Sequence, residues 1–254
     1  MRIATWNVNS VRARLPHLLD WLDATRPDVV CLQETKVTDA DFPRSEIEAR
    51  GFGLAVHGQK TWNGVAILSR VGLQDVQSGL PGFEDPRARV LAATVGPLRV
   101  VCLYAPMGEA VGSEKYAYKL NWYDALLRWV TSGPGRPDVL AGDLNVAPDD
   151  RDVWDPALLA GTVLVSEPER ARFRALLETG YHDALRVHTE ESGIYTWWDY
   201  RAAAFRRKMG MRLDHVLVST PLVPRIANVR VHRDMRAREA TSDHAPLDVD
   251  LREP

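Results

Sequence analysis

Short apolar runs rich in Val, Ile and Leu recur along the 254-residue chain, and those between residues 64 and 104 follow one another with no helical segment between them. Runs of this kind, bounded by Gly, Pro, Asn or Asp, are typical of β-strands, and their direct succession is typical of antiparallel hairpins. The runs are "RIATWNV", "DVVCLQE", "GVAILS", "RVLAATV", "LRVVCLYA", "DVLAGDLN", "IYTWW", "RLDHVLVS", "NVRVHR" and "PLDVDL". Strict alternation of strands and helices is therefore excluded.

Three longer segments have the spacing of amphipathic helices and lie between groups of strands. Residues 10–25 carry leucines at helical spacing, residues 113–130 carry a stripe of Tyr and Leu, and residues 166–180 open on a capping box from Ser166 to Glu169. We therefore predict an α/β fold in which two mixed β-sheets pack face to face with helices on the outside. Functional groups would lie on loops at one edge of this sandwich.

The composition excludes some classes of protein. No apolar run approaches the roughly 20 residues that a membrane span needs, and the N-terminus lacks the pattern of a secretory signal. Cys31 and Cys102 lie inside apolar runs, which favours buried thiols in a reducing compartment over a disulfide or a metal site. A cytoplasmic protein is expected.

The charge is unevenly distributed along the chain. The net charge of −2 does not by itself indicate a nucleic-acid partner, but residues 199–212 carry Arg or Lys at positions 201, 206, 207, 208 and 212 against one acid. Such a cluster suits phosphates, and the alternative is an ordinary solvated loop.

Polar side chains stand where the apolar runs end or begin. They are Asn7, Asn9, Glu34, Tyr104, Asp143, Asn145, Asp214, His215, Asp243 and His244. Each alone has an ordinary explanation, since Asp143 could cap a turn and Glu34 could pair with Lys36. Within its strand, alternation sends Asp214 and His215 to opposite faces.

Taken together, these side chains suit cation binding and hydrolysis of a phosphate ester. Carboxylates and amide oxygens with no Cys and few His suit a hard cation, Mg²⁺ or Mn²⁺. An Asp that holds a His fixes its tautomer and lets the ring carry charge. The hydrolysis of a phosphodiester needs such a set: a cation, a charged His, amide and phenol donors, and a carboxylate to deprotonate water.

A set of motifs, in order from the first strand to the last, resembles the exonuclease III branch of the endonuclease/exonuclease/phosphatase superfamily. The motifs are "WNVNSVRAR", "DVVCLQETK", "HGQKTWNGVAILS", "YAPMGE", "GDLNVAP", "YTWWDYR", "GMRLDHVLVS" and "SDHAP". Other superfamily members share "GDLN" and "SDHAP", whereas the full set with "QETK" and "WWDYR" is specific to the DNA-repair branch. The resemblance covers essentially the whole chain, as a single domain over residues 1–254.

The resemblance implies a four-layer α/β sandwich and a Mg²⁺-dependent nuclease in which Mn²⁺ can substitute. Members of the branch cleave DNA 5′ to abasic sites, and many also have 3′→5′ exonuclease and 3′-phosphatase or phosphodiesterase activity on duplex DNA. The expected partner is double-stranded DNA with abasic sites or 3′ ends, in base excision repair. A monomer that does not associate with membranes is expected.

The resemblance also assigns roles to individual residues. Glu34 would be the principal metal ligand, with Asn7 and Asp243 nearby. Asp243 would face the metal and His244 the phosphate. Because adjacent residues of a regular strand point oppositely, both can serve only on the loop before "PLDVDL".

The implied catalytic residues are Tyr104, Asp143, Asn145, Asp214 and His244. Asp143 would orient or deprotonate the attacking water, and Asn145 would hold the scissile phosphate. His244, oriented by Asp214, would contact that phosphate and stabilise its charge. Tyr104 would donate to the phosphate or to the leaving oxygen. Whether Asp143 alone is the base, and whether one or two metals act, stays open.

The aromatic motif "YTWWDYR" resembles the family's pocket for a flipped-out abasic deoxyribose. Trp197 and Trp198 would form its walls and Met211 would close it, because a tight apolar pocket admits a sugar and excludes a base. The alternative is that one of the two tryptophans belongs to the core. Candidate contacts to the DNA backbone are Arg12, Lys36 and residues 206–208.

One position departs from the family's pattern. Met107, in "YAPMGE", stands where relatives carry an amide side chain. An amide could donate to DNA, whereas Met can only pack. The departure puts in doubt the balance between exonuclease and abasic-site activities but leaves the chemistry intact.

Two other functions stay open. A superfamily phosphatase acting on a lipid or inositol phosphate would share the metal and His chemistry, although the double Trp and the basic loop speak against it. A DNA-binding relative that has lost catalysis is disfavoured, because every matched catalytic position keeps its functional group.

Overall fold

The computed structural model describes residues 1–132 and 135–253, in which the chain forms two six-stranded sheets. The first, in the order β11-β12-β1-β2-β4-β3, contains β1 (Arg2–Asn7), β2 (Val29–Gln33), β3 (Gly53–His57), β4 (Val65–Ser69), β11 (Ile226–Val231) and β12 (Leu247–Leu251). The second, in the order β5-β6-β7-β8-β10-β9, contains β5 (Gln74–Ser78), β6 (Val90–Val95), β7 (Leu98–Tyr104), β8 (Val139–Asp143), β9 (Tyr181–Asp183) and β10 (Asp214–Ser219). Both sheets are mixed, as predicted, because β1–β2 and β7–β8 are parallel and the other pairs are antiparallel.

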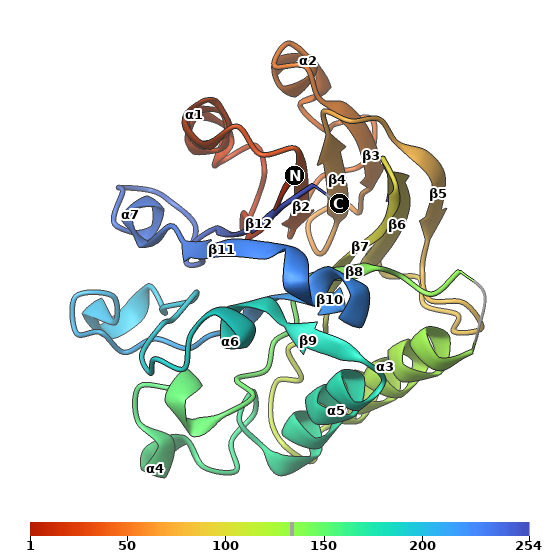
Figure 1. Cartoon of the computed structure of the whole chain (residues 1–254). Helices are drawn as coiled ribbons and strands as arrows, with labels where there is room; N and C mark the ends of the chain where they lie inside the picture. Colours follow the sequence, from red (N-terminus) through yellow and green to blue (C-terminus); the bar gives the residue numbers. More distant parts are fainter. Residues whose placement is uncertain (133–134, 254) are drawn as a thin grey trace.

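The helices lie on the outer faces of the two sheets (Figure 1). Over the first sheet pack α1 (Leu15–Thr25), α2 (Arg44–Glu48) and α7 (Arg233–Arg236), and over the second pack α3 (Glu114–Thr131) and α5 (Glu167–Glu178). The remaining helical segments are α4 (Pro156–Leu159), α6 (Ala184–His188) and the 3₁₀ turns η1 (Asp150–Asp152), η2 (Arg201–Ala203) and η3 (Thr220–Arg225). Among the described residues, no helix combines the length and hydrophobicity that a membrane span requires.

Alternation along the strands divides the core into layers. Val29 and Cys31 of β2 face between the sheets, where they join Cys102 of β7. Val30 and Leu32, which lie between them in the sequence, face the outer helices. This period of two lets one strand serve two hydrophobic layers. Both cysteines are buried free thiols, as expected.

Some predicted elements differ from the observed ones. The run "IYTWW" makes only isolated bridges, from Trp197 to Met211 and to His244, and is not a regular strand. The strands β3, β5 and β9 were not predicted, since β5 is exposed along its whole length and β9 has three residues. Of the strands predicted between residues 64 and 104, β6 and β7 form an antiparallel hairpin as expected, whereas β4 belongs to the other sheet.

The topology brings several strand ends to one rim. Parallel strands end at the same edge, so Asn7 at the end of β1 lies beside Gln33 at the end of β2, and Tyr104 lies beside Asp143. An antiparallel strand starts where its neighbour ends, so Asp214 at the start of β10 pairs with Asp143. The polar groups that follow the apolar runs therefore gather at this rim.

Candidate active site

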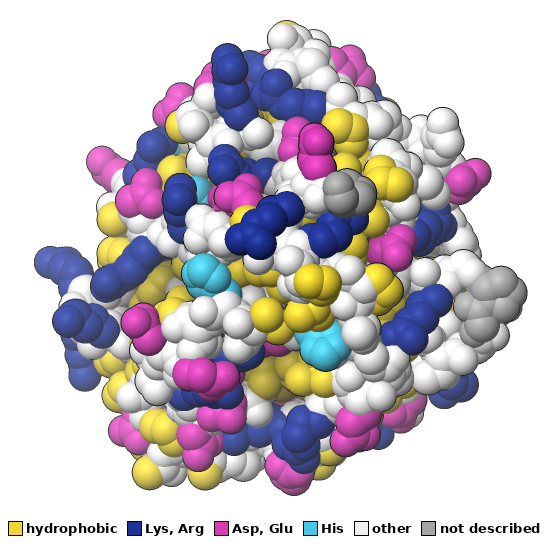
Figure 2. Space-filling view, viewed as in Figure 1, with side chains coloured by type: hydrophobic (Ala, Val, Ile, Leu, Met, Phe, Trp, Pro, Cys, Tyr) yellow, Lys and Arg dark blue, Asp and Glu magenta, His cyan; other side chains and the backbone are white. Residues whose placement is uncertain are grey.

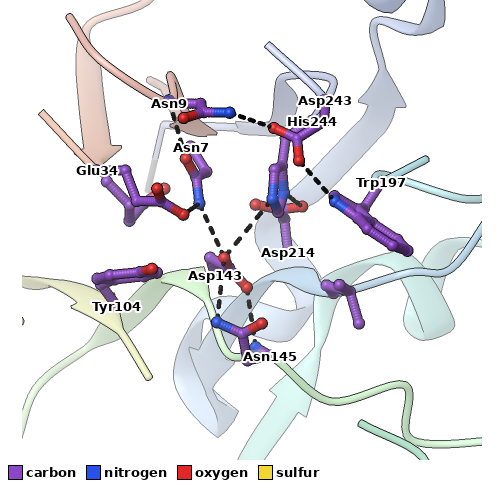
Figure 3. Close-up of polar contacts among 12 residues, drawn as sticks. Asn7, Asn9, Glu34, Tyr104, Asp143, Asn145, Trp197, Asp214, Asp243 and His244 are labelled. Atoms are coloured by element: carbon purple, nitrogen blue, oxygen red, sulfur yellow. Dashed lines mark hydrogen bonds and ion pairs between the residues drawn. The ribbon is translucent and has the colours of Figure 1, made fainter. Parts of the chain in front are cut away.

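The amide of Asn7 lies at the centre of the rim and joins two carboxylates (Figure 3). Its Nδ2 donates to Oε1 of Glu34 at 2.8 Å and to Oδ2 of Asp143 at 2.9 Å. Asn7 ends β1 and is fully buried, and Glu34 directly follows β2, the parallel neighbour of β1. Two carboxylates from distant motifs, one on each sheet, thus lie within hydrogen-bond distance of one nitrogen.

A second series of contacts connects Glu34 with Asp243. Nζ of Lys36 lies 2.8 Å from Oε2 of Glu34 and donates to Oδ1 of Asn9 at 2.5 Å. Nδ2 of Asn9 donates to Oδ1 of Asp243 at 3.0 Å. The other oxygen of Asp243 accepts from the indole of Trp197 at 3.0 Å. Lys36 and Asn9 therefore connect Glu34 with Asp243 and fix their relative positions.

His244 is buried between two carboxylates. Its Nδ1 lies 2.8 Å from Oδ2 of Asp214, and its Nε2 lies 3.8 Å from Oδ2 of Asp143. Burial disfavours the charged ring, but the negative charges of Asp214 and Asp143 outweigh it and raise the pKa of His244 to about 10. At neutral pH the ring is therefore an imidazolium that can stabilise a negatively charged group.

The loop before β12 fixes the direction of the His244 ring. Oγ of Ser242 donates to the carbonyl of Asn7 at 2.6 Å and accepts from the His244 amide at 3.1 Å. The indole of Trp6 donates to the carbonyl of His244 at 3.1 Å. Both Asp243 and His244 lie outside β12, which is the loop position that the motif required.

The carboxylate of Asp143 is less well stabilised than that of Glu34. Burial raises the pKa of Asp143 and the charge of Asp214 adds to this, while His244 and Asn7 only partly offset them. A carboxylate with a raised pKa is a better proton acceptor than an ordinary one. Asp143 is therefore suited to receive a proton from water.

Asn145 and Tyr104 flank Asp143. The amide N–H of Asn145 donates to Oδ1 of Asp143 at 2.9 Å, and its side-chain Nδ2 donates to the carbonyl of Ala105 at 2.9 Å. Burial and the charges of Glu34 and Asp143 raise the pKa of the Tyr104 phenol well above its ordinary value, so the phenol keeps its proton. The Nδ2 of Asn145 also donates to Oδ2 of Asp143 at 3.4 Å, so the phenol of Tyr104 is the O–H donor beside this carboxylate.

Four rim residues have a left-handed backbone, which non-glycine residues rarely adopt. They are Asn9 (φ 45°), Glu34 (φ 53°), Lys36 (φ 56°) and Asn145 (φ 48°). Each such conformation costs of the order of 1–3 kcal/mol and persists where the surroundings enforce it, as the Ser10 amide does by donating to the carbonyl of Glu34 at 2.7 Å. Asn tolerates the left-handed region, so the strain falls on Glu34 and Lys36.

One group of potential metal ligands is already engaged. Ligand atoms of Asp143, Asp214 and His244 all lie within 4.8 Å of one another. The Nδ1 of His244 already bonds to Asp214 at 2.8 Å, and the raised pKa of His244 disfavours the neutral ring that a metal ligand requires.

Glu34, Asn7 and Asp243 carry carboxylate and amide oxygens, which are the ligands that hard divalent cations prefer. The Oδ1 of Asn7 accepts from the amide of Asn9 at 3.0 Å, and its Nδ2 faces Glu34. Burial opposes the charge of Glu34, but Lys36 and Asn7 outweigh it and lower its pKa, so this carboxylate is ionised at neutral pH. That these three side chains bind a metal stays a prediction from the sequence.

The two tryptophans of "YTWWDYR" have different surroundings. Trp197 is partly buried beside Met211 and Leu213, and its indole contacts Asp243 at the rim. Trp198 is 2% exposed and packs in a separate cluster with Ala204 and Ala245. The prediction that Trp198 forms a wall of the sugar pocket is therefore corrected, and the alternative, a core residue, holds for it.

The basic residues also separate into distinct groups. Arg206, Arg207 and Lys208 are exposed, and Figure 2 shows Lys and Arg side chains gathered at the margin where Figure 1 draws their loop. Arg12 is exposed as well and pairs with Asp41 at 3.3 Å.

Arg212, counted with this basic cluster in the sequence, is instead 1% exposed. Its guanidinium bonds to Asp152 at 2.7 and 3.0 Å and to Asp183 at 2.6 Å. It is not available to phosphates. Lys36 likewise has a partner in the fold, since it pairs with Glu34.

A cavity of about 470 Å³ opens beside Glu34 and Tyr104. The exposed side chains of Trp62 and Met107 line it, and Met107 offers no N–H at this position. Its basic residues are Arg87, Arg89 and Lys115. The cavity extends the rim with cations and an exposed indole, which suits a nucleic-acid strand.

Sequence reasoning missed residues that act through the backbone. Oγ1 of Thr196 accepts from the amides of Leu213 and Asp214, each at 3.0 Å, and so fixes the start of β10. Lys119 of α3 is also buried, and its partners lie outside the helix. Neither role follows from local spacing.

Comparisons with known proteins agree with this geometry. The chain matches the model of the Endonuclease/Exonuclease/phosphatase family over residues 4–244. It is 34% identical to exodeoxyribonuclease III of Haemophilus influenzae over 266 residues, which cover 97% of this chain and 98% of the relative.

Solved structures with the same fold cover the chain completely. A 3′ phosphatase, NExo from Neisseria, bound to a product DNA hairpin, is 44% identical with a TM-score of 0.96, and each chain is covered to 100%. An AP endonuclease from Archaeoglobus fulgidus is 36% identical with a TM-score of 0.95, again with 100% of each chain covered.

Proposed function

Because this chain belongs to the endonuclease/exonuclease/phosphatase family, we propose that it is a DNA-repair nuclease that hydrolyses phosphoesters of duplex DNA with the help of Mg²⁺. The proposed reactions are cleavage 5′ to abasic sites, 3′→5′ exonucleolytic hydrolysis and removal of 3′-phosphate groups. Relatives named for each of these activities support the proposal.

One observation carries the proposal most strongly. The charged ring of His244 lies between Asp214 and Asp143, and the same Asp143 carboxylate bonds to the Asn7 amide that holds Glu34. A cationic donor, a basic carboxylate and a separate set of oxygen ligands are thereby combined within a few ångströms. Hydrolysis of a phosphodiester needs these three elements together.

Each side chain of the rim would have its own role in the reaction. Asp143 orients the attacking water and accepts its proton at a carboxylate oxygen. His244, held by Asp214, faces the phosphate and stabilises the charge that accumulates on its oxygens. Asn145 and Tyr104 donate hydrogen bonds, the first to the phosphate and the second to the phosphate or the leaving oxygen.

Glu34, with Asn7 and Asp243, would hold Mg²⁺, or Mn²⁺ in its place. When bound, the ion supplies positive charge that offsets the charge of the phosphate and of the leaving oxygen.

For substrate selection, we propose that Trp197 and Met211 bound the pocket for an abasic deoxyribose. Trp197 is partly exposed and its indole bonds to Asp243 at the rim, and the buried Met211 pairs with it through an isolated β-bridge. The exposed cations of residues 206–208, together with Arg12, would contact the DNA backbone without reading its sequence. The cellular setting would be the cytoplasm, and the protein would act as a monomer.

The test compares three duplex oligonucleotides: one with an abasic analogue, one with a recessed 3′ end and one with a 3′-phosphate. We expect product from all three with Mg²⁺ and none with EDTA. The His244→Asn variant should lose turnover equivalent to roughly 3–4 kcal/mol of transition-state stabilisation, as for a lost oxyanion donor. Absence of any product from folded wild-type protein supplied with Mg²⁺ would refute the proposal. So would a soluble phosphoinositide hydrolysed much faster than DNA.

A further inference from the structure

Lys119 lies on α3 beneath two loops of the rim and is completely buried. Its Nζ donates to the carbonyl of Asn145 at 2.6 Å, to the carbonyl of Met107 at 3.1 Å, and to Oε1 of Glu169. The three acceptors match the three N–H bonds of an ammonium group. One helix residue thus bonds to the loop after β8, the loop after β7 and the start of α5.

The partner carboxylate is engaged independently of the rim. Glu169 is also completely buried, and its Oε1 accepts from the amide of Leu164 at 3.0 Å. Its Oε2 accepts from the amide of Ser166 at 3.1 Å and from the Ser166 hydroxyl, which completes the capping box of α5. The role of Glu169 in capping α5 can therefore be separated from the contacts of Lys119 with the rim loops.

Other elements hold the peptides of the loop after β8. Asn145 turns the chain with a φ of 48°, and its Nδ2 donates to the carbonyl of Ala105 in the neighbouring loop. The Lys119 bond to the Asn145 carbonyl fixes the peptide that follows this turn. One turn further along α3, the hydroxyl of Tyr123 donates to the carbonyl of Leu144, so the same helix face holds two successive peptides.

The loop after β7 packs on the stem of Lys119. A Cβ placed on Gly108, which has a φ of 99°, would lie 3.1 Å from Cδ of Lys119. The loop carrying Met107 and Gly108 thus lies in contact with the methylene chain as well as the ammonium group. The Lys119 side chain therefore restrains both loops at once.

We infer that Lys119 is a positioning residue for the hydrolysis proposed above: it sets the relative placement of the Asn145 loop and the Met107 loop, between which the scissile phosphate is held. This inference rests on the proposed function for its catalytic consequence. The geometric part, that Lys119 restrains both loops, does not depend on the substrate.

The experiment uses two variants of the full chain. Lys119→Met/Glu169→Gln removes the ammonium donor and the opposing charge together, so that no unpaired charge stays buried, and Gln can maintain the capping box. Glu169→Gln alone is the control for the loss of the carboxylate, because it keeps the Lys119 amine and its bonds to both carbonyls. It also removes the counter-charge of the buried ammonium, so its folding is measured first. Urea unfolding of both variants establishes that each is folded.

Turnover on the abasic duplex gives the catalytic readout. We expect kcat of the double variant to fall by about 100-fold relative to Glu169→Gln, as for a reacting group displaced by about 1 Å, while KM changes little. Amide hydrogen exchange gives a readout without substrate. Segments 105–109 and 143–147 should exchange about 10-fold faster in the double variant than in the control.

Several results would distinguish the two proposals. If the double variant has the kcat of the control, or if both segments exchange at equal rates in the two variants, the positioning role is refuted. If Glu169→Gln does not fold, the double variant is compared with wild type, and the same two outcomes decide. If wild type lacks turnover on DNA but the double variant still exchanges faster, the proposed function fails while the restraint of both loops is supported.

Discussion

Two groups of buried charged side chains share one segment of the chain and differ in how many cations face their carboxylates. Around Arg212, the guanidinium bonds to the carboxylates of Asp152 and Asp183, and a further arginine, Arg186, also bonds to Asp152. At the rim, His244 is the single cation between Asp143 and Asp214. Arg212 and Asp214 flank the same residue, Leu213, so one segment contributes to both groups.

The two groups also differ in the pKa values of their carboxylates. Although burial opposes ionisation, Arg212 and its hydrogen bonds lower the pKa of Asp183, and the two carboxylates raise that of Arg212. These groups stay charged over a wide pH range. At the rim, burial and the charge of Asp214 raise the pKa of Asp143. The first group is satisfied within the fold and stabilises it, whereas the second leaves a carboxylate that a cation, a water or a phosphate can use.

The largest expected effect concerns catalysis at the rim. Asp143→Asn should lower turnover by about 10²–10⁴-fold, because the proposed base is lost. Its free energy of unfolding should stay equal or rise, since a carboxylate disfavoured by burial is removed. Turnover on an abasic duplex and urea unfolding check both parts, with the exposed Glu48→Gln as the control for charge. A large loss of stability would contradict the view that burial disfavours the Asp143 carboxylate.

In the group around Arg212, a substitution should lower the stability of the fold. Arg212→Met should lower the free energy of unfolding by about 3–5 kcal/mol, because Asp152 and Asp183 would stay buried without their main partner. The exposed Arg206→Met, from the same basic stretch, should change it by less than about 0.5 kcal/mol. Urea unfolding measures both. Equal losses in the two variants would mean that the buried group does not stabilise the fold.

The two groups should also respond to opposite ends of the pH range. The pKa of His244 is raised from 6.5 to about 10, so its contribution to stability is full below pH 6.5 and is lost as pH rises through about 10. The pKa of Asp183 is lowered, so its contribution is present above the ordinary Asp range and is lost only as pH falls through the lowered value.

Between pH 7 and pH 9, with EDTA present, unfolding free energy should therefore fall by up to about 1.4 kcal/mol per pH unit. His244→Asn should flatten this slope. Urea unfolding at several pH values tests the prediction, and an equally steep slope in the variant would assign the loss to another group.

The smallest expected effect is a difference in stability caused by backbone strain at Glu34. Glu34→Gly should be more stable than Glu34→Ala by about 1 kcal/mol, because Gly adopts the left-handed conformation of this position without a Cβ penalty. Both variants lose the carboxylate, so the difference reports the backbone alone. Thermal unfolding of the pair gives the measurement. Equal stabilities would show that the surroundings impose no strain on Glu34.

Local sequence patterns were sufficient where the physical cause is local. The apolar run "DVVCLQE" predicts a strand, and the structure confirms it as β2 (Val29–Gln33), which is buried throughout. Alternation along a strand separates Asp214, which faces His244, from His215, which faces Arg212. The capping box at Ser166 and Glu169 was also correctly predicted.

Contacts between distant segments could not be predicted in this way. The paired "WW" of residues 197 and 198 has no local feature that tells which indole reaches the rim, since the answer depends on the loops that cover each side. Arg212 had the spacing of a basic surface cluster, yet two aspartates from other elements surround it. Burial of a charge depends on partners far away in the chain, and periodicity contains no information about them.

The sequence by itself determined which chemical groups this protein has and that they follow the ends of strands, because strand period and turn chemistry are local properties of the chain. The tertiary structure alone decided their distances, their charge states and the strain at Glu34. Those quantities arise from the packing of one sheet against the other and from the low dielectric between them, which no short stretch of sequence contains.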